Sequence, residues 1–131
     1  MSQYIVSLPD LVIPNGAAVS NVLHAKGATV GAPAGGGSGA GNTDGFGFRD
    51  ADNIEILAPA ALPETVVVQV DSAEPGSTDN FDTLQQAGVD TTLLAGKAVM
   101  IVSPSFKQLQ LKAGVNVAGT RTFKVNKRVR I

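Results

Sequence analysis

The glycine-rich run from Gly35 to Gly39 is the part of this sequence that most resembles a phosphate-binding loop. A P-loop places a lysine and a hydroxyl residue directly after its last glycine, because the lysine contacts the phosphates and the hydroxyl binds magnesium. No lysine follows this run. A dinucleotide-binding fingerprint needs a helix after the glycines, and the following residues show no helical pattern. We therefore expect no nucleotide and no other cofactor.

An acidic cluster follows the glycines, formed by Asp44, Asp50, Asp52 and Glu55. Calcium prefers oxygen ligands from loops of this kind. The order of ligands that defines an EF-hand, with a glycine at its sixth position, is absent. The interpretation we favour is a solvated acidic start of a strand, and we predict no metal site.

Ser20 and His24 supply the hydroxyl and imidazole of a hydrolytic triad, but nothing in their spacing fixes their geometry. The chain has no G-x-S-x-G elbow and no cysteine. Aromatic residues make up 5% of the chain and tryptophan is absent, which argues against sugar and single-strand nucleic-acid binding, since both use aromatic stacking. We predict no catalytic residues and no enzymatic activity.

The composition predicts one folded domain over residues 1–131. Of the 131 residues, 44% are hydrophobic and 16% are charged, which is typical of a chain that buries a core and is too short for two. No apolar run approaches the ~18 residues of a membrane span. The first ten residues lack the basic and apolar regions of a signal peptide.

Short runs with apolar residues at every second position dominate the chain, separated by Gly and Pro turns, and no window shows a convincing helical stripe. This pattern predicts an all-β fold, an antiparallel β-sandwich of the jelly-roll type. The expected strands cover residues 3–8, 11–13, 17–23, 53–57, 65–71, 91–94, 98–102, 106–112 and 120–131, with 81–86 as a further short candidate.

Three details follow from the same pattern. Pro9 is expected to end the first strand. The uninterrupted apolar run at 98–102 predicts a central strand buried on both faces. Phe106 has the wrong parity for its strand, which predicts a bulge or a strand start after it.

A long Gly-rich loop interrupts the strand pattern between Gly27 and Gly47, where nine of the fifteen glycines lie. Loops of this length are uncommon in compact domains and are usually functional or disordered. One interpretation is a flexible surface loop. The other is an arm that lies along a neighbouring molecule, where a glycine backbone approaches closely.

The charges are segregated along the chain: all eleven acidic residues lie at or before Asp90, and eight of the ten basic residues lie after it. In one interpretation, the acidic and basic residues of neighbouring strands neutralise each other within the molecule. In the other, they form a bipolar surface that docks onto a partner. For the terminal cluster we favour docking.

The segment 120–131 therefore carries our second partner-binding prediction. Its basic residues lie mainly on one face of the expected strand, which suits an edge strand that adds to a partner, with charge steering the contact. A charged edge that blocks aggregation is the alternative, and direct nucleic-acid binding is disfavoured. The candidate partner-binding residues are Gly35, Gly36, Gly37, Gly39, Lys124, Lys127, Arg128 and Arg130.

Over residues 53–126 the sequence resembles small structural proteins of tailed bacteriophages, most closely head decoration or cement proteins with a jelly-roll or β-sandwich fold. The resemblance lies in the stretches I-E-I-L-A-P-A-A-L-P-E-T-V-V-V-Q-V, F-D-T-L-Q-Q-A-G-V-D-T-T-L-L-A-G-K-A-V, F-K-Q-L-Q-L-K-A-G and R-T-F-K-V.

This resemblance implies a virion protein on the outside of the capsid that binds the major capsid protein. It would bridge neighbouring subunits as a homo-oligomer, a dimer or a trimer, and would have no enzymatic activity. The alternative is a tail, baseplate or fibre module that takes part in host attachment.

Overall fold

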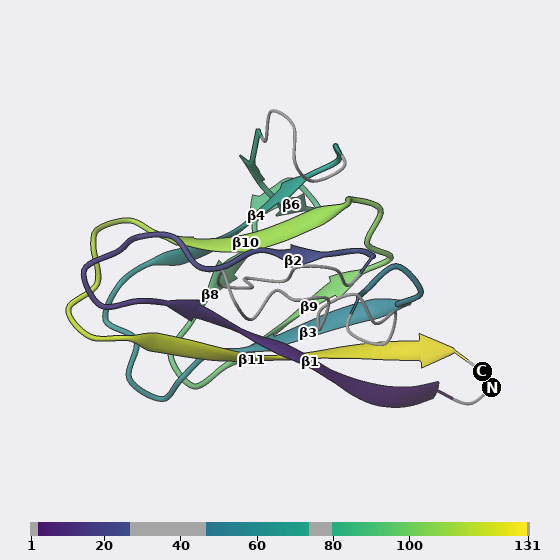
Figure 1. The fold of residues 1–131 in the computed structure, drawn as a ribbon, viewed down its shortest axis with the longest axis horizontal. Coiled ribbons are helices and arrows are strands. Elements are labelled where there is room, and N and C mark those ends of the chain that lie inside the picture. Colours follow the sequence, from purple (N-terminus) through teal and green to yellow (C-terminus); the bar gives the residue numbers. More distant parts are fainter. Residues whose placement is uncertain (1–2, 27–46, 74–79, 131) are drawn as a thin grey trace, which may run out of the picture.

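The computed structural model describes residues 3–26, 47–73 and 80–130. These residues form eleven β-strands and no helix, and hence no helix that would cross a membrane. Two antiparallel sheets pack against each other (Figure 1). The prediction of an all-β antiparallel sandwich is therefore confirmed.

We call the four-stranded sheet sheet A and the five-stranded sheet sheet B. Sheet A has the strand order β1 (Gln3–Ile13), β11 (Arg121–Arg130), β3 (Asn53–Leu57), β9 (Ala98–Val102). Sheet B has the order β2 (Leu23–His24), β10 (Gln108–Ala113), β4 (Val66–Asp71), β5 (Asp82–Thr83), and β8 (Thr92–Leu93) also pairs with β4. A separate hairpin is formed by β6 (Gln85–Gln86) and β7 (Val89–Asp90).

The strand pairs are nested, since β1 pairs with β11, β2 with β10, β3 with β9, and β4 with β8. This is the order produced when one long hairpin is rolled into two sheets, which is the jelly-roll arrangement. Most of these pairs join distant parts of the sequence. Each sheet is thus assembled from both halves of the chain.

The hydrophobic core fills the space between the sheets and is built mainly from alternate residues of the longer strands. Ile54, Ile56 and Phe123 of sheet A and Leu109 and Leu111 of sheet B are completely buried. Each such side chain contributes about 1.5–3 kcal/mol through loss of contact with water. Phe48 packs on Phe106 with the ring centroids 5.5 Å apart, outside the strands.

The sequence predicted that the first strand ends at Pro9, and this prediction is wrong. β1 continues to Ile13 through a bulge between Leu8 and Leu11. Asn21 closes the outer edge of this bulge: its Oδ1 accepts the Val12 N–H at 2.7 Å and its Nδ2 donates to the Asp10 carbonyl at 3.1 Å. These bonds satisfy backbone groups of Asp10 and Val12 beside the bulge, and β1 continues past Pro9.

Two further predictions about strand neighbours are wrong. The apolar run 98–102 is not a central strand: within the described residues β9 pairs along one edge only, with β3, and Ile101 is its one fully buried residue. The basic strand β11 is not an edge strand, because it lies between β1 and β3 and pairs with both. The apolar run at 98–102 thus specified neither burial on both faces nor position in the sheet.

The remaining expectations have mixed outcomes. The segment 17–23 is not one strand, and forms only an isolated bridge at Val19 and the first residue of β2. β10 begins at Gln108, which confirms a strand start after Phe106. Residues 27–46, with most of the Gly-rich loop, lie outside the described residues.

Candidate functional site

The basic strand β11 is neutralised within the molecule. Each of its five cations lies within 4 Å of a carboxylate from the first half of the chain. The pairs are Arg121–Glu64 at 2.9 Å, Lys124–Asp10 at 3.1 Å, Lys127–Asp50 at 2.7 Å, Arg128–Glu55 at 3.7 Å and Arg130–Asp52 at 3.2 Å. Internal neutralisation between strands, the alternative we disfavoured for this segment, is therefore what the structure has.

Lys127 occupies a core position and not the solvent face of β11. Its Nζ donates to the Gly47 carbonyl and to Asp50 Oδ1, both at 2.7 Å. A buried ammonium group is tolerated only when its hydrogen bonds are satisfied in this way. Lys127 therefore anchors the segment that enters β3, with its side chain buried, and its contact with a partner stays a prediction. Contact of Lys124, Arg128 and Arg130 with a partner stays a prediction.

Arg121 and Glu64 form a two-pronged ion pair between sheet A and the residues before β4. Arg121 Nε lies 3.0 Å from Glu64 Oε1, and Nη2 lies 2.9 Å from Oε2. These bonds lower the pKa of the Glu64 carboxyl and raise the pKa of the guanidinium. This geometry fixes the orientation of both groups, and its role is structural.

Three acidic residues that follow the Gly-rich loop are bound to cations of β11. Asp50, Asp52 and Glu55 each pair with a different cation of β11, and Asp44 lies outside the described residues. Within the described ranges, no group of three or more His, Cys, Asp or Glu side chains is placed to hold a metal ion.

The hydroxyl group of Ser20 is hydrogen-bonded to backbone groups. Its hydroxyl donates to the Asn21 carbonyl at 2.7 Å and accepts the Leu111 N–H at 2.8 Å. These bonds hold the segment before β2 against β10. Ser20 thus has a structural function, and no triad with His24 is needed to explain it.

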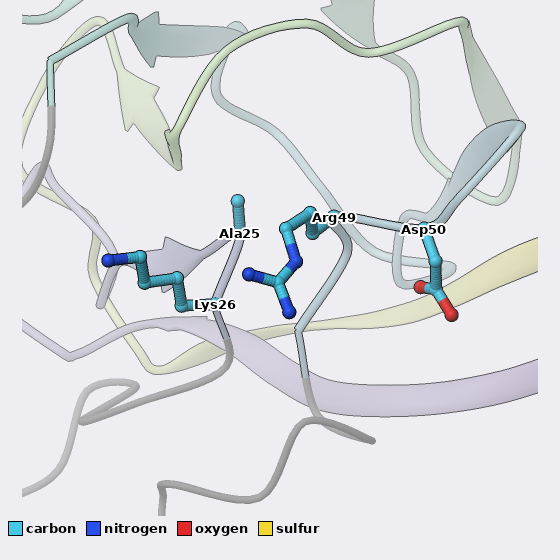
Figure 2. Close-up of a pocket in the computed structure, with 4 residues that line it drawn as sticks. All are labelled: Ala25, Lys26, Arg49 and Asp50. Atoms are coloured by element: carbon cyan, nitrogen blue, oxygen red, sulfur yellow. The ribbon is translucent and has the colours of Figure 1, made fainter.

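A small cationic hollow lies where residues 27–46 join the described fold. Its lining residues are Ala25, Lys26, Arg49 and Asp50, and Figure 2 shows the side chains of Lys26 and Asp50 extending away from each other on either side of Arg49. The Arg49 N–H donates to the Ala25 carbonyl at 3.0 Å, so the two segments are fastened together at this point. The candidate residues Gly35, Gly36, Gly37 and Gly39 lie outside the described residues.

The feature that the sequence analysis missed is the outer edge of β9. The side-chain amide of Gln86 binds there: Nε2 donates to the Met100 carbonyl at 3.1 Å, and Oε1 accepts the Val102 N–H at 3.2 Å. One amide thus occupies the place of a neighbouring strand. The sequence offered no signal for this edge, because edge strands usually carry charges and an uncharged apolar run is typical of a central strand.

An exposed aliphatic hollow adjoins this edge. Its lining includes Gln86, Val89, Thr91, Leu94 and Val99. Val89 is 67% exposed and Leu94 is 62% exposed. The Thr91 hydroxyl is buried and has no hydrogen-bond partner within the described residues. Exposed aliphatic residues gathered in one hollow are typical of a contact surface.

Comparison with known proteins gives little. No family model matches the chain, and no curated protein matches it. Two solved structures of one protein are similar in part: IMPa metallopeptidase from Pseudomonas aeruginosa, and IMPa in complex with an O-glycopeptide. Each has 18% sequence identity, a TM-score of 0.46 and coverage of 98% of this chain. The chain spans 12% of the length of either structure, and we base no functional conclusion on them.

Proposed function

We propose that this protein is a head decoration (cement) protein of a tailed bacteriophage. In this role it binds the lattice of the major capsid protein on the outside of the head and stabilises the head by bridging neighbouring subunits. The resemblance of residues 53–126 to such proteins supports the proposal, as does the jelly-roll arrangement that the resemblance implied.

The observation that carries the proposal is the outer face of sheet A. The strand registers place Val102, Asn53, Arg128 and Ile5 in one row across this face. Both ends of the row are exposed aliphatic residues, Ile5 at 56% and Val102 at 62%. A row of this kind offers apolar contact at both edges of the sheet.

Charges on the same face are already paired. Lys124 binds Asp10 and Arg128 faces Glu55, while Leu57 adds further exposed aliphatic surface. A charge-balanced face with apolar margins suits a protein partner better than a nucleic acid, which requires unpaired cations. Attachment to the shell should therefore depend only weakly on salt.

Mass spectrometry of purified particles tests the role directly, by the copy number of this chain relative to the major capsid protein. We expect many copies on each head. Immunogold labelling separates the head from the tail, and gold confined to tails would replace the proposal with the tail, baseplate or fibre alternative. Absence from purified particles would overturn both.

Binding of purified variants to heads that lack the protein tests the surface. Ile5→Glu and Leu57→Glu should each weaken attachment at least tenfold, because they place an uncompensated charge in the contact. Val115→Glu is the matched control, since Val115 is 63% exposed in the turn after β10. Equal binding by all three variants would exclude this face.

A further inference from the structure

We propose that β9 is a dimerisation edge, at which sheet A continues into sheet A of a second copy of this chain through antiparallel pairing of β9 with β9. This inference goes beyond the proposed function and does not depend on it, because pairing in solution requires no capsid.

The chemistry of the edge selects an extended polypeptide. The Met100 carbonyl and the Val102 N–H both point away from β3, and both are bound by the amide of Gln86. A peptide group presents the same donor and acceptor, and a whole strand supplies several in a row. The Gln86 side chain therefore makes the hydrogen bonds that a neighbouring strand would make, and the strand of a second copy can displace it.

The residues of β9 are self-complementary. A two-fold axis through Met100 places Met100 opposite Met100 and Ala98 opposite Val102 of the second copy, as an isologous interface requires. All five residues of β9 are uncharged, so no like charges oppose each other. Cross-strand pairs of aliphatic side chains are favourable relative to alanine pairs.

Exposed aliphatic residues beside the β9 edge also favour contact with a second copy at this edge. Val89, Leu94 and Val102 are each more than 60% exposed. Val89 and Leu94 both line the hollow beside this edge. A second copy at the β9 edge would remove this aliphatic surface from water.

The opposite edge of sheet A is less suitable for pairing. β1 carries a bulge, and Asn21 covers that part of its edge with three hydrogen bonds, two from its side chain and one from its N–H to the Val12 carbonyl at 3.3 Å. Bulges twist an edge away from a regular partner. Among the residues that the structure describes, the β3–β9 ladder has no bulge, and the side chain of Gln86 covers the outer edge of β9.

Sedimentation velocity of the full chain tests the dimer. A five-residue strand pair buries less than the roughly 800 Å² per partner of a standard interface, so we expect dissociation in the micromolar range or above. Val102→Lys should weaken the dimer at least tenfold, because an edge lysine opposes strand pairing. Ile5→Lys, the matched change at the other end of the same row, should leave the dimer unchanged.

Cysteine cross-linking tests the register, since the chain has no cysteine of its own. Met100→Cys should give a disulfide-linked dimer on mild oxidation, because residues facing each other in a ladder lie at a distance that a disulfide spans. Ser7→Cys is the control, because the registers place Ser7 in the same row as Met100 on the opposite edge strand.

Removal of the Gln86 side-chain amide should have the opposite effect on the stability of the dimer. Gln86→Ala should strengthen the dimer roughly tenfold, since two internal hydrogen bonds no longer compete with the second copy; circular dichroism confirms that the variant is folded. A wild-type chain that stays monomeric at about 1 mM, or faster cross-linking of the Ser7→Cys variant than of the Met100→Cys variant, would overturn the proposal.

Discussion

The ammonium nitrogen of Lys127 lies 2.7 Å from Asp50 Oδ1, although the lysine side chain is only 3% exposed and the aspartate side chain is 60% exposed. One partner of this ion pair is thus inside the sandwich and the other is at its surface. The second hydrogen bond of the ammonium group goes to the Gly47 carbonyl. The pair fixes the point at which the chain enters the sandwich after residue 46.

Replacement of Lys127 tests this anchoring function. Lys127→Ala should lower the free energy of unfolding by about 2–4 kcal/mol, because the Gly47 carbonyl loses its donor and a cavity remains. Lys127→Met keeps the volume and should cost about half as much. Urea denaturation gives both values. Lys124→Met removes an exposed pair and should change the free energy by less than about 0.5 kcal/mol; a similar loss in Lys124→Met would contradict a special function of Lys127.

The hairpin between β6 and β7 offers a stabilising substitution. Ala87 and Gly88 have φ values of 55° and 80°, which is the left-handed conformation that a two-residue type I′ turn requires at both positions. Alanine is strained there and asparagine is favoured. Ala87→Asn should raise the free energy of unfolding by about 0.5–1 kcal/mol, measured by thermal and urea denaturation. Gly88→Ala should lower it by a similar amount, and a neutral Gly88→Ala would contradict this turn type.

Two neighbouring residues of β9 test its position at the edge of sheet A. Ile101 is 1% exposed and Val102 is 62% exposed. Ile101→Ala should cost about 2–5 kcal/mol in the free energy of unfolding, whereas Val102→Ala should cost less than about 0.5 kcal/mol. Both are measured on monomeric protein at low concentration, where pairing between copies does not contribute. Equal costs would mean that β9 is buried on both faces.

The stability should fall in acid because two carboxyl groups have lowered pKa values. Hydrogen bonds from Arg121 lower the pKa of Glu64 below 4.5, and the N–H groups of Ala73 and Asn80 lower the pKa of Asp71 below 3.8. Such groups stabilise the fold above their unfolded-state pKa, and this contribution is lost as the pH falls through the folded-state value. Urea midpoints should therefore decrease below about pH 4.5.

Glu64→Gln separates the contribution of Glu64 from the rest. The variant should be less stable than the wild type at neutral pH, because a neutral amide binds Arg121 less strongly. The difference should shrink as the pH falls, since the wild-type carboxyl group becomes protonated as well. A difference that stays constant from neutral pH to acid would show that the ion pair does not contribute to the acid sensitivity.

Sequence alone determined the fold class and much of the strand content of this protein. Alternation at 53–57 and 65–71 predicted β3 and β4, and the Gly and Pro turns between short runs predicted an antiparallel sandwich. Even the burial of Lys127 had a signal, because this residue shares its parity with Phe123, Val125 and Val129. Alternation of apolar and polar residues along a strand indicates which face of the sheet each side chain occupies, and it depends only on residues within that strand.

Only the tertiary structure decided which strands are neighbours. An alternating or apolar run carries no information about its lateral partners, so 98–102 and 120–131 were assigned to the centre and the edge, whereas β9 is at the edge and β11 is in the centre. The same limit applies to charge. The cations of β11 find their carboxylates 57 to 114 residues away in the sequence, because rolling the chain into nested strand pairs brings its acidic and basic halves side by side.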